Sequence, residues 1–297
     1  MPEENRLYPS RGTRPISPFT LVFVCAFSLF VPGPAMGRAW SQWDGPALYW
    51  TGSPSPGLLA QEAKLSKHDS IPPGAILPVI LRTTISPHKA SRGQIIHAVI
   101  AQDVPLPDGS KVSRGSKVEG RVVEVIPAGK GAGARISIRF DKLYFQGRTI
   151  LITTNLRAIA GFMAVLEAGI PNQGMGEGDV ASWMTTTQVG GDSVFGVWGP
   201  VTSAHDATHV VGKSVGDGVL AQVQSNERAN CRGVLNGNNS PQALWVFSSD
   251  ACGTYGLANV SISHAGRTDP AGTIILEFQA KNAIIHSGAG LLLRLIG

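Results

Sequence analysis

The chain has 297 residues, enough for one large domain or two modest domains with a buried core. Its 36 glycines, 20 prolines and 15% charged residues are typical of a turn-rich chain with many short strands and argue against a helical bundle. The formal net charge of +5 includes no long run of Lys and Arg, so we expect no nucleic acid partner.

Residues 1–37 are predicted to be a signal peptide. Arginines precede an apolar core, Phe19 to Val31, that is shorter than the roughly 20 residues of a spanning helix and fits the h-region of an export signal. The prolines Pro32 and Pro34 end this core, and Ala35-Met36-Gly37 supplies the small residues that a signal peptidase reads. We therefore expect cleavage after Gly37. The alternative is a retained anchor, because no charge interrupts residues 15–37.

Residues 38–70 are predicted to be a linker, because Trp, Gly, Pro and Ser occur there without a sustained period. From residue 71 to residue 155 the sequence changes to short alternating apolar runs separated by glycine-containing turns, which is typical of antiparallel strands. The predicted strands are Ala75–Ile85, Gln94–Ile100, Lys117–Ile126, Ala134–Leu143 and Arg148–Thr154.

Residues 156–297 are predicted to form a second β-rich region. The stretch 155–185 holds the one expected short helix, because Ile159, Phe162, Met163 and Leu166 have helical spacing and Gly169 ends the pattern. Residues 172–219 are expected to be loops with short strands. Alternation returns in Gly218–Ser225, Ala243–Ser248, Leu257–His264, Gly272–Phe278 and Ala289–Ile296.

Two cysteines, Cys231 and Cys252, remain after removal of the leader, and we predict a disulfide between them. They bracket an expected hairpin whose strands are residues 232–235 and 243–248 and whose turn is Asn236 to Asn239. Closing a loop of this size contributes about 3 kcal/mol in an entropic model. The alternative is two buried free thiols.

Four segments occur in an order that is characteristic of one family. They are Ile71 to Thr83, with its Ile-Pro-x-Gly opening; Ala101-Gln102-Asp103-Val104; Arg114 to Val122, with a Gly-Ser step into Gly-x-Val; and Arg135 to Leu143. Together they resemble the C-terminal domain of TrbI-like proteins, the periplasm-spanning scaffold components of conjugation and type IV secretion channels. The resemblance covers residues 71–154, and residues 287–296 are similar to the closing strand of the family.

The resemblance implies a small β-barrel. The expected fold class is therefore mostly β: a small β-barrel with a disulfide-stapled β extension and one short helix. The family also carries a pair of amphipathic helices that builds an outer-membrane pore, and the sequence contains no such pair. The implied role is that of a non-enzymatic, periplasmic or secreted envelope protein with protein partners in a secretion- or conjugation-like complex. Membrane contact is expected only through an uncleaved leader.

Several motifs suggest chemistry, and each has a simpler interpretation. Gly212 to Gly216 fits the Gly-x-Ser-x-Gly elbow of a secreted serine hydrolase, with His205, His209 or His264 as partners. The elbow requires a helix after the serine, and Asp217-Gly218 prevents one, so we predict a glycine-rich loop. His205 and His209 have the i, i+4 spacing of metal ligands on a helix, but their neighbours favour a surface loop.

Three further groups complete the candidates. His264, Arg267 and Asp269 could bind an anion or carboxylate, or could form a turn network in which Asp269 caps the backbone. Gly129 to Gly133 is interpreted as a hairpin loop rather than a phosphate cradle. The aromatic residues Trp198, Trp245 and Tyr255 would line a shallow cleft if the protein were a carbohydrate- or peptidoglycan-binding module, and otherwise pack in the core. No catalytic, metal-binding or cofactor-binding residue is predicted.

Overall fold

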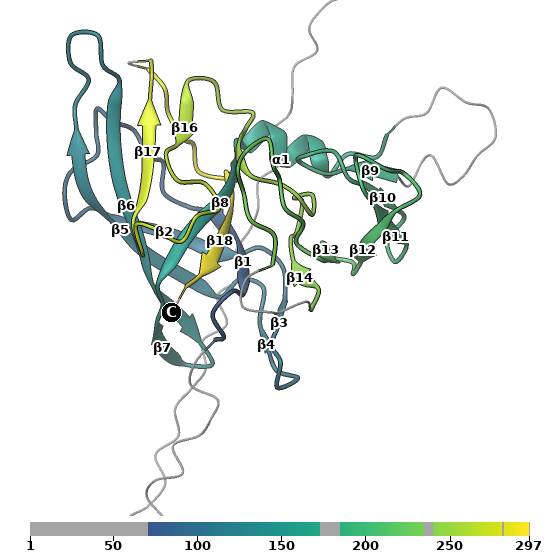
Figure 1. Cartoon of the computed structure of the whole chain (residues 1–297). Helices are drawn as coiled ribbons and strands as arrows, with labels where there is room; N and C mark the ends of the chain where they lie inside the picture. The colour runs from purple at the N-terminus through teal and green to yellow at the C-terminus, as the bar shows by residue number, and fades with distance from the viewer. Residues whose placement is uncertain (1–70, 173–184, 235–239, 281, 297) are drawn as a thin grey trace, which may run out of the picture. The chain divides into compact units, whose positions relative to one another are not determined.

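The computed structural model describes residues 71–172, 185–234, 240–280 and 282–296 (Figure 1). The expected signal peptide and linker, residues 1–70, lie outside the described residues. The described part belongs to one compact unit, which begins at Ala60. It is mostly β, as predicted, and its α-helix is α1 (Phe162–Ala168).

The larger sheet has ten strands, and its order is β15-β8-β18-β1-β2-β5-β6-β17-β16, with β7 paired to β6. Neighbours are antiparallel except β15 and β8, which are parallel. The strands are β1 (Ile76–Leu81), β2 (Ile95–Ile100), β5 (Lys117–Ile126), β6 (Ala134–Phe145), β7 (Arg148–Leu151), β8 (Thr154–Ala160), β15 (Gly253–Tyr255), β16 (Val260–Ile262), β17 (Ile274–Phe278) and β18 (Gly290–Leu295).

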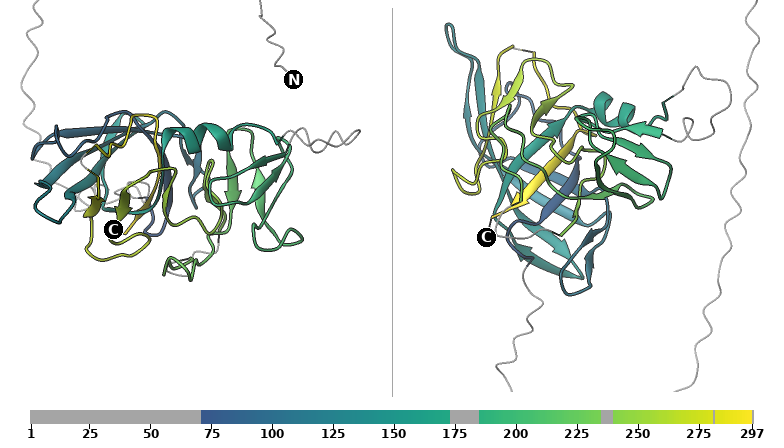
Figure 2. Two further views of the ribbon diagram at one scale, coloured as in Figure 1. Left: turned by 90° about the horizontal axis from the view of Figure 1, so that it is seen from above. Right: turned by 45° about the vertical axis from the view of Figure 1, so that its right-hand side comes forward.

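The sheet is curled but open (Figure 2). Its end strands, β15 and β16, lie near each other, yet among the described residues no ladder of backbone hydrogen bonds joins them. The strand expected to close a barrel, β18, lies inside the sheet, where it pairs with β1 on one side and β8 on the other. This C-terminal strand therefore joins β1 to β8.

The inner face of the curled sheet holds the main core. Side chains alternate across a strand, so Leu291, Leu293 and Leu295 of β18 point inward. They meet Leu77 and Val79 of the paired strand β1, and all five side chains are almost fully buried. Burial of these apolar side chains stabilises the sheet.

A second sheet covers the outer face of β1, β8 and β18. Its order is β14-β13-β12-β11-β10-β9. Ile76, Ala158 and Leu292 from the first sheet pack with Val201 and Phe247 in a second core. The strands of the second sheet are β9 (Thr185–Thr187), β10 (Ser193–Phe195), β11 (Pro200–Thr202), β12 (Val210–Ser214), β13 (Val219–Ala221) and β14 (Gln242–Ala243), and a separate hairpin is formed by β3 (Val104–Pro105) and β4 (Lys111–Val112).

The helix is shorter than predicted, because the expected helical stretch begins with a strand. Residues 154–160 form β8, and Ile159 points into the main core rather than along a helix. Gly161, with φ −63° and ψ 158°, is in extended conformation and separates strand from helix. The residues that have helical spacing from Ile159 onward therefore belong to two elements, β8 and α1. The predicted strand 148–154 is likewise divided between β7 and β8.

Two further expectations are corrected. The boundary placed between residues 155 and 156 falls inside β8, and four strands from the later region complete the first sheet. The expected hairpin strand 243–248 is only the short β14, which pairs with β13 instead of with residues 232–234. The chain turns immediately afterwards, at Trp245, whose φ of 55° is left-handed. The expected turn at Asn236 to Asn239 lies outside the described residues.

Candidate functional site

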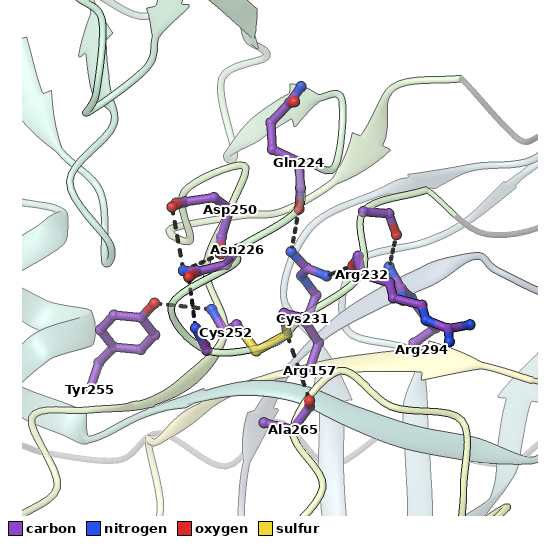
Figure 3. Close-up of a disulfide and its surroundings, with 12 residues drawn as sticks. Arg157, Gln224, Asn226, Cys231, Arg232, Asp250, Cys252, Tyr255, Ala265 and Arg294 are labelled. Carbon is purple, nitrogen blue, oxygen red and sulfur yellow. Dashed lines mark hydrogen bonds between the residues drawn. A yellow bond between two sulfur atoms is a disulfide. The ribbon is translucent and has the colours of Figure 1, made fainter.

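The predicted disulfide between Cys231 and Cys252 is present (Figure 3). It closes a sequence separation of 21 residues, with the two Cα atoms 6.3 Å apart. Gly266, at φ +66°, packs directly on the sulfur, because a Cβ on this residue would lie 2.1 Å from Cys231 Sγ. The disulfide thus supports the loop that begins at His264.

Two buried arginines hold the disulfide segment on the outer face of the first sheet (Figure 3). Arg157 of β8 donates hydrogen bonds from its Nη atoms to the carbonyl oxygens of Arg232, at 2.6 Å, and Gln224, at 2.7 Å. Arg294 of β18 donates from Nη2 to the carbonyl oxygen of Gly233 at 2.7 Å. The backbone on both sides of Cys231 is therefore held by side chains of β8 and β18.

The charge of these arginines is poorly compensated. Their exposed fractions are 1% for Arg157 and 2% for Arg294, and no ion pair joins either one to a described carboxylate. Burial, assisted by repulsion from Arg294, lowers the pKa of Arg157 to about 10, and burial lowers the pKa of Arg294 to about 10. The Nε and Nη1 groups of Arg294 have no acceptor. Positive charge thus lies beneath the disulfide segment.

A hydrogen-bonded group around Asp250, here called the Asp250 cluster, lies on the other side of the disulfide. Asp250 accepts a hydrogen bond from Ser248 Oγ at 3.0 Å, and its other oxygen lies 3.0 Å from His205 Nε2. Asn226 Nδ2 donates to the Asp250 carbonyl oxygen at 3.1 Å, and the Tyr255 hydroxyl accepts from the Cys252 amide at 3.0 Å. Burial raises the pKa of the Tyr255 hydroxyl. These bonds join three loops beside a cavity of about 570 Å³.

The loop after His264 forms the rim of a second cavity, of about 670 Å³. Its backbone is tied by Asn155, whose Nδ2 donates to the Arg267 carbonyl oxygen at 2.7 Å and whose Oδ1 accepts from the Gly272 amide at 3.0 Å. The turn-network interpretation of the sequence expected Asp269 to cap the backbone of this loop, but Asn155 makes these hydrogen bonds. The cavity is lined by Asn230, Arg232, His264, Gly266, Arg267, Thr268, Asp269 and Pro270.

The chain matches no model of a known family, no curated protein and no solved structure. The chemistry of the site therefore has to be inferred from its own residues.

The Gly212 to Gly216 motif has the wrong geometry for a hydrolase elbow. Ser214 ends β12 and is buried, and a tight turn closed by the Val215 amide and the Gly218 carbonyl leads straight into β13. An elbow needs a strand followed by a helix, whereas this is a strand followed by a strand.

The two histidines of the suggested metal motif lie in a loop rather than on a helix. His205 bonds to Asp250, and the His209 amide donates to the Asp206 carbonyl within a turn. In the part of the chain that the structure describes, no three His, Cys, Asp or Glu side chains are placed to hold a metal ion. The hairpin loop expected at Gly129 to Gly133 is confirmed between β5 and β6.

The three candidate aromatic residues do not share one cleft. Trp198 is 74% exposed and lies over Gly216 at the β12–β13 turn. Trp245 packs against Gly290 at the junction of the two sheets, and Tyr255 belongs to the Asp250 cluster. Trp198 is therefore the most exposed of the three, whereas Trp245 and Tyr255 are partly buried.

Sequence reasoning missed the buried arginines and Asn155. One signal was available: each arginine is a lone charge in an apolar strand, Arg157 among Leu156, Ala158 and Ile159, and Arg294 within a run of leucines. A charge at such a position requires local acceptors or a ligand. The acceptors come from a distant loop, so the pattern could not have identified them.

Proposed function

We propose that the chain is an exported, non-enzymatic protein of the cell envelope that acts through protein contacts in a secretion- or conjugation-like assembly. The observation that supports this proposal is the surface of α1. Phe162, Met163, Leu166 and the following Ile170 are 48%, 57%, 49% and 53% exposed, whereas the buried residue of the helix is the small Ala168. A helix that turns its large apolar side chains to solvent marks an interaction surface.

Export is supported by separate observations. A disulfide persists in an oxidising compartment, and the leader at residues 1–37 has the pattern of a signal peptide. Within the described ranges, no helix is long and apolar enough to cross a bilayer. Sequencing of the exported chain should give Arg38 as its first residue, and a chain that still begins at Met1 would favour the retained anchor.

The test of the proposed function is a pull-down from envelope fractions with the tagged exported chain. We expect secretion-channel subunits to be recovered, and a Phe162→Ser, Met163→Ser, Leu166→Ser variant to recover about tenfold less, since buried aromatic and Met anchors dominate interfaces. Leu151→Ser is the matched control, because Leu151 is an apolar residue on β7 that is 79% exposed. Equal recovery by all three proteins would reject α1 as the contact surface.

A second candidate, a carbohydrate- or peptidoglycan-binding module, rests on Trp198. Its ring is held against Gly216 and exposed on one face, as in a stacking platform for sugars. Under this alternative the chain is retained on purified cell-wall polymer, and Trp198→Ala abolishes the retention while the α1 variant does not.

A further inference from the structure

We propose that the cavity between the disulfide segment and the loop after His264, here called the Arg232–Arg267 pocket, binds the carboxylate of an acidic sugar. This site is distinct from the α1 surface and does not depend on it. Its volume of about 670 Å³ is in the range of small-molecule sites.

The backbone of the pocket is fixed from beneath. The carbonyl of Arg232 is held by Arg157, and the carbonyl of Arg267 is held by Asn155. Between them Gly266 rests on the disulfide and donates its amide to the Leu156 carbonyl at 2.9 Å. Both basic residues therefore start from anchored positions, which lowers the entropy lost when a ligand binds.

The side chains above this backbone have no partner of their own. Among the described residues, no hydrogen bond or ion pair occupies the side chains of Arg232, His264 or Arg267. Arg232 and Arg267 both line this one cavity, and arginine suits a carboxylate, which accepts paired hydrogen bonds from a guanidinium group. The structure thus leaves the binding groups of the pocket free.

The charge around the pocket favours an anion. Its lining carries two arginines against one carboxylate, Asp269. The buried cations Arg157 and Arg294 lie behind the same segment, and two N–H groups of Arg294 have no acceptor. Buried charges are screened less than surface charges, so they add to the attraction for an anion.

The polar rim selects the kind of anion. Asn230, Thr268 and Asp269 offer amide, hydroxyl and carboxylate groups that bond to sugar hydroxyls. Asp269 also repels a second negative charge, which disfavours a doubly charged phosphate. A single carboxylate on a hydroxyl-bearing ring satisfies both conditions.

The test is a calorimetric titration of the exported chain with glucuronate, glucose, acetate and inorganic phosphate. We expect glucuronate to bind best, and Arg232→Gln and Arg267→Gln each to weaken it at least tenfold, the loss typical of one charge-assisted hydrogen bond pair. Arg92→Gln is the control, because Arg92 is an exposed arginine in the turn before β2. Asp269→Asn should improve phosphate binding relative to glucuronate.

Four outcomes would overturn the proposal. These are the absence of glucuronate binding to a folded chain, equal binding of glucose, tighter binding of phosphate than of glucuronate to the unaltered protein, and an equal loss in the Arg92→Gln variant. Thermal unfolding of each variant establishes that it is folded. None of these results bears on recovery of channel subunits through α1, so the two proposals fail separately.

Discussion

The two buried arginines show how one side chain can replace a secondary-structure partner. Residues 224–233 pass over the outer face of β8 and β18 without a strand ladder to them, so their carbonyl groups need donors from elsewhere. Arg157 satisfies two of these carbonyls, whereas Arg294 satisfies one and keeps two unpaired N–H groups. The two residues therefore differ in what their removal costs.

We predict that two similar substitutions change the free energy of unfolding by different amounts. Arg157→Met should lower the free energy of unfolding by about 2–3 kcal/mol, because two partly buried carbonyls lose their donors. Arg294→Met removes one bond together with an uncompensated buried charge, so the change should stay within about 1 kcal/mol. Urea unfolding at neutral pH measures both values. A larger loss for Arg294→Met would contradict the assignment of roles.

Asp103 is expected to make stability sensitive to acid. The backbone amide of Arg114 and the Lys111 ammonium group both donate to its carboxylate and hold the pKa of Asp103 below 3.8. The folded-state pKa is thus lower than the unfolded one, so this stability is fully present above pH 3.8 and is lost as the pH falls through the folded-state pKa. Asp103→Asn should flatten the pH dependence of unfolding in that acid range, and an unchanged slope would refute the prediction.

At the level of elements, the sequence predicted what is local and failed where the outcome depends on distant partners. Alternation of apolar and polar residues identified strands such as β2 and β5, since a half-buried strand has apolar residues at every second position. Strand β8 could not be recognised in the sequence, because it is buried on both faces and its residues do not alternate between apolar and polar. The pairing of β14 with β13 also could not be predicted, since turn residues alone do not specify partners.

The disulfide could be predicted from the cysteine number and the expected export, but its surroundings could not. It packs under a glycine 14 residues beyond Cys252, a contact with no sequence signature. The same limit applies to the Arg232–Arg267 pocket. Its two arginines are far apart in sequence, and His264, Arg267 and Asp269 were recognisable only as one half of it.

Removal of the disulfide should lower the stability of the fold but leave the core folded. A Cys231→Ser, Cys252→Ser variant should lose about 3 kcal/mol, the loop-closure value for a separation of this size. A reducing agent should lower the stability of the unaltered protein by a similar amount and leave the variant unchanged. Urea unfolding with and without reductant gives all four values. If reductant also destabilised the variant, the effect would not come from this bond.

At the scale of the whole described unit, hydrogen bonds join the two sheets in addition to the apolar contact between them. Gln102, which is fully buried, donates from Nε2 to the Val219 carbonyl at 2.9 Å and accepts from the Trp245 amide at 2.6 Å. Gly218 leaves room for it, since a Cβ there would lie 2.4 Å from Gln102 Oε1. One side chain from the segment after β2 thereby forms hydrogen bonds to β13 and to the turn after β14.

This arrangement predicts that both sheets unfold together. Gln102→Leu leaves the Trp245 amide unpaired and leaves the Val219 carbonyl with the Leu244 amide as its one donor, which should lower the free energy of unfolding by about 1–3 kcal/mol. Gln222→Leu is the control, because Gln222 is an exposed glutamine just after β13. Because the second core contains residues of both sheets, hydrogen exchange should accelerate equally in β13 and in β6. Faster exchange in β13 alone would mean that the second sheet opens as a separate unit.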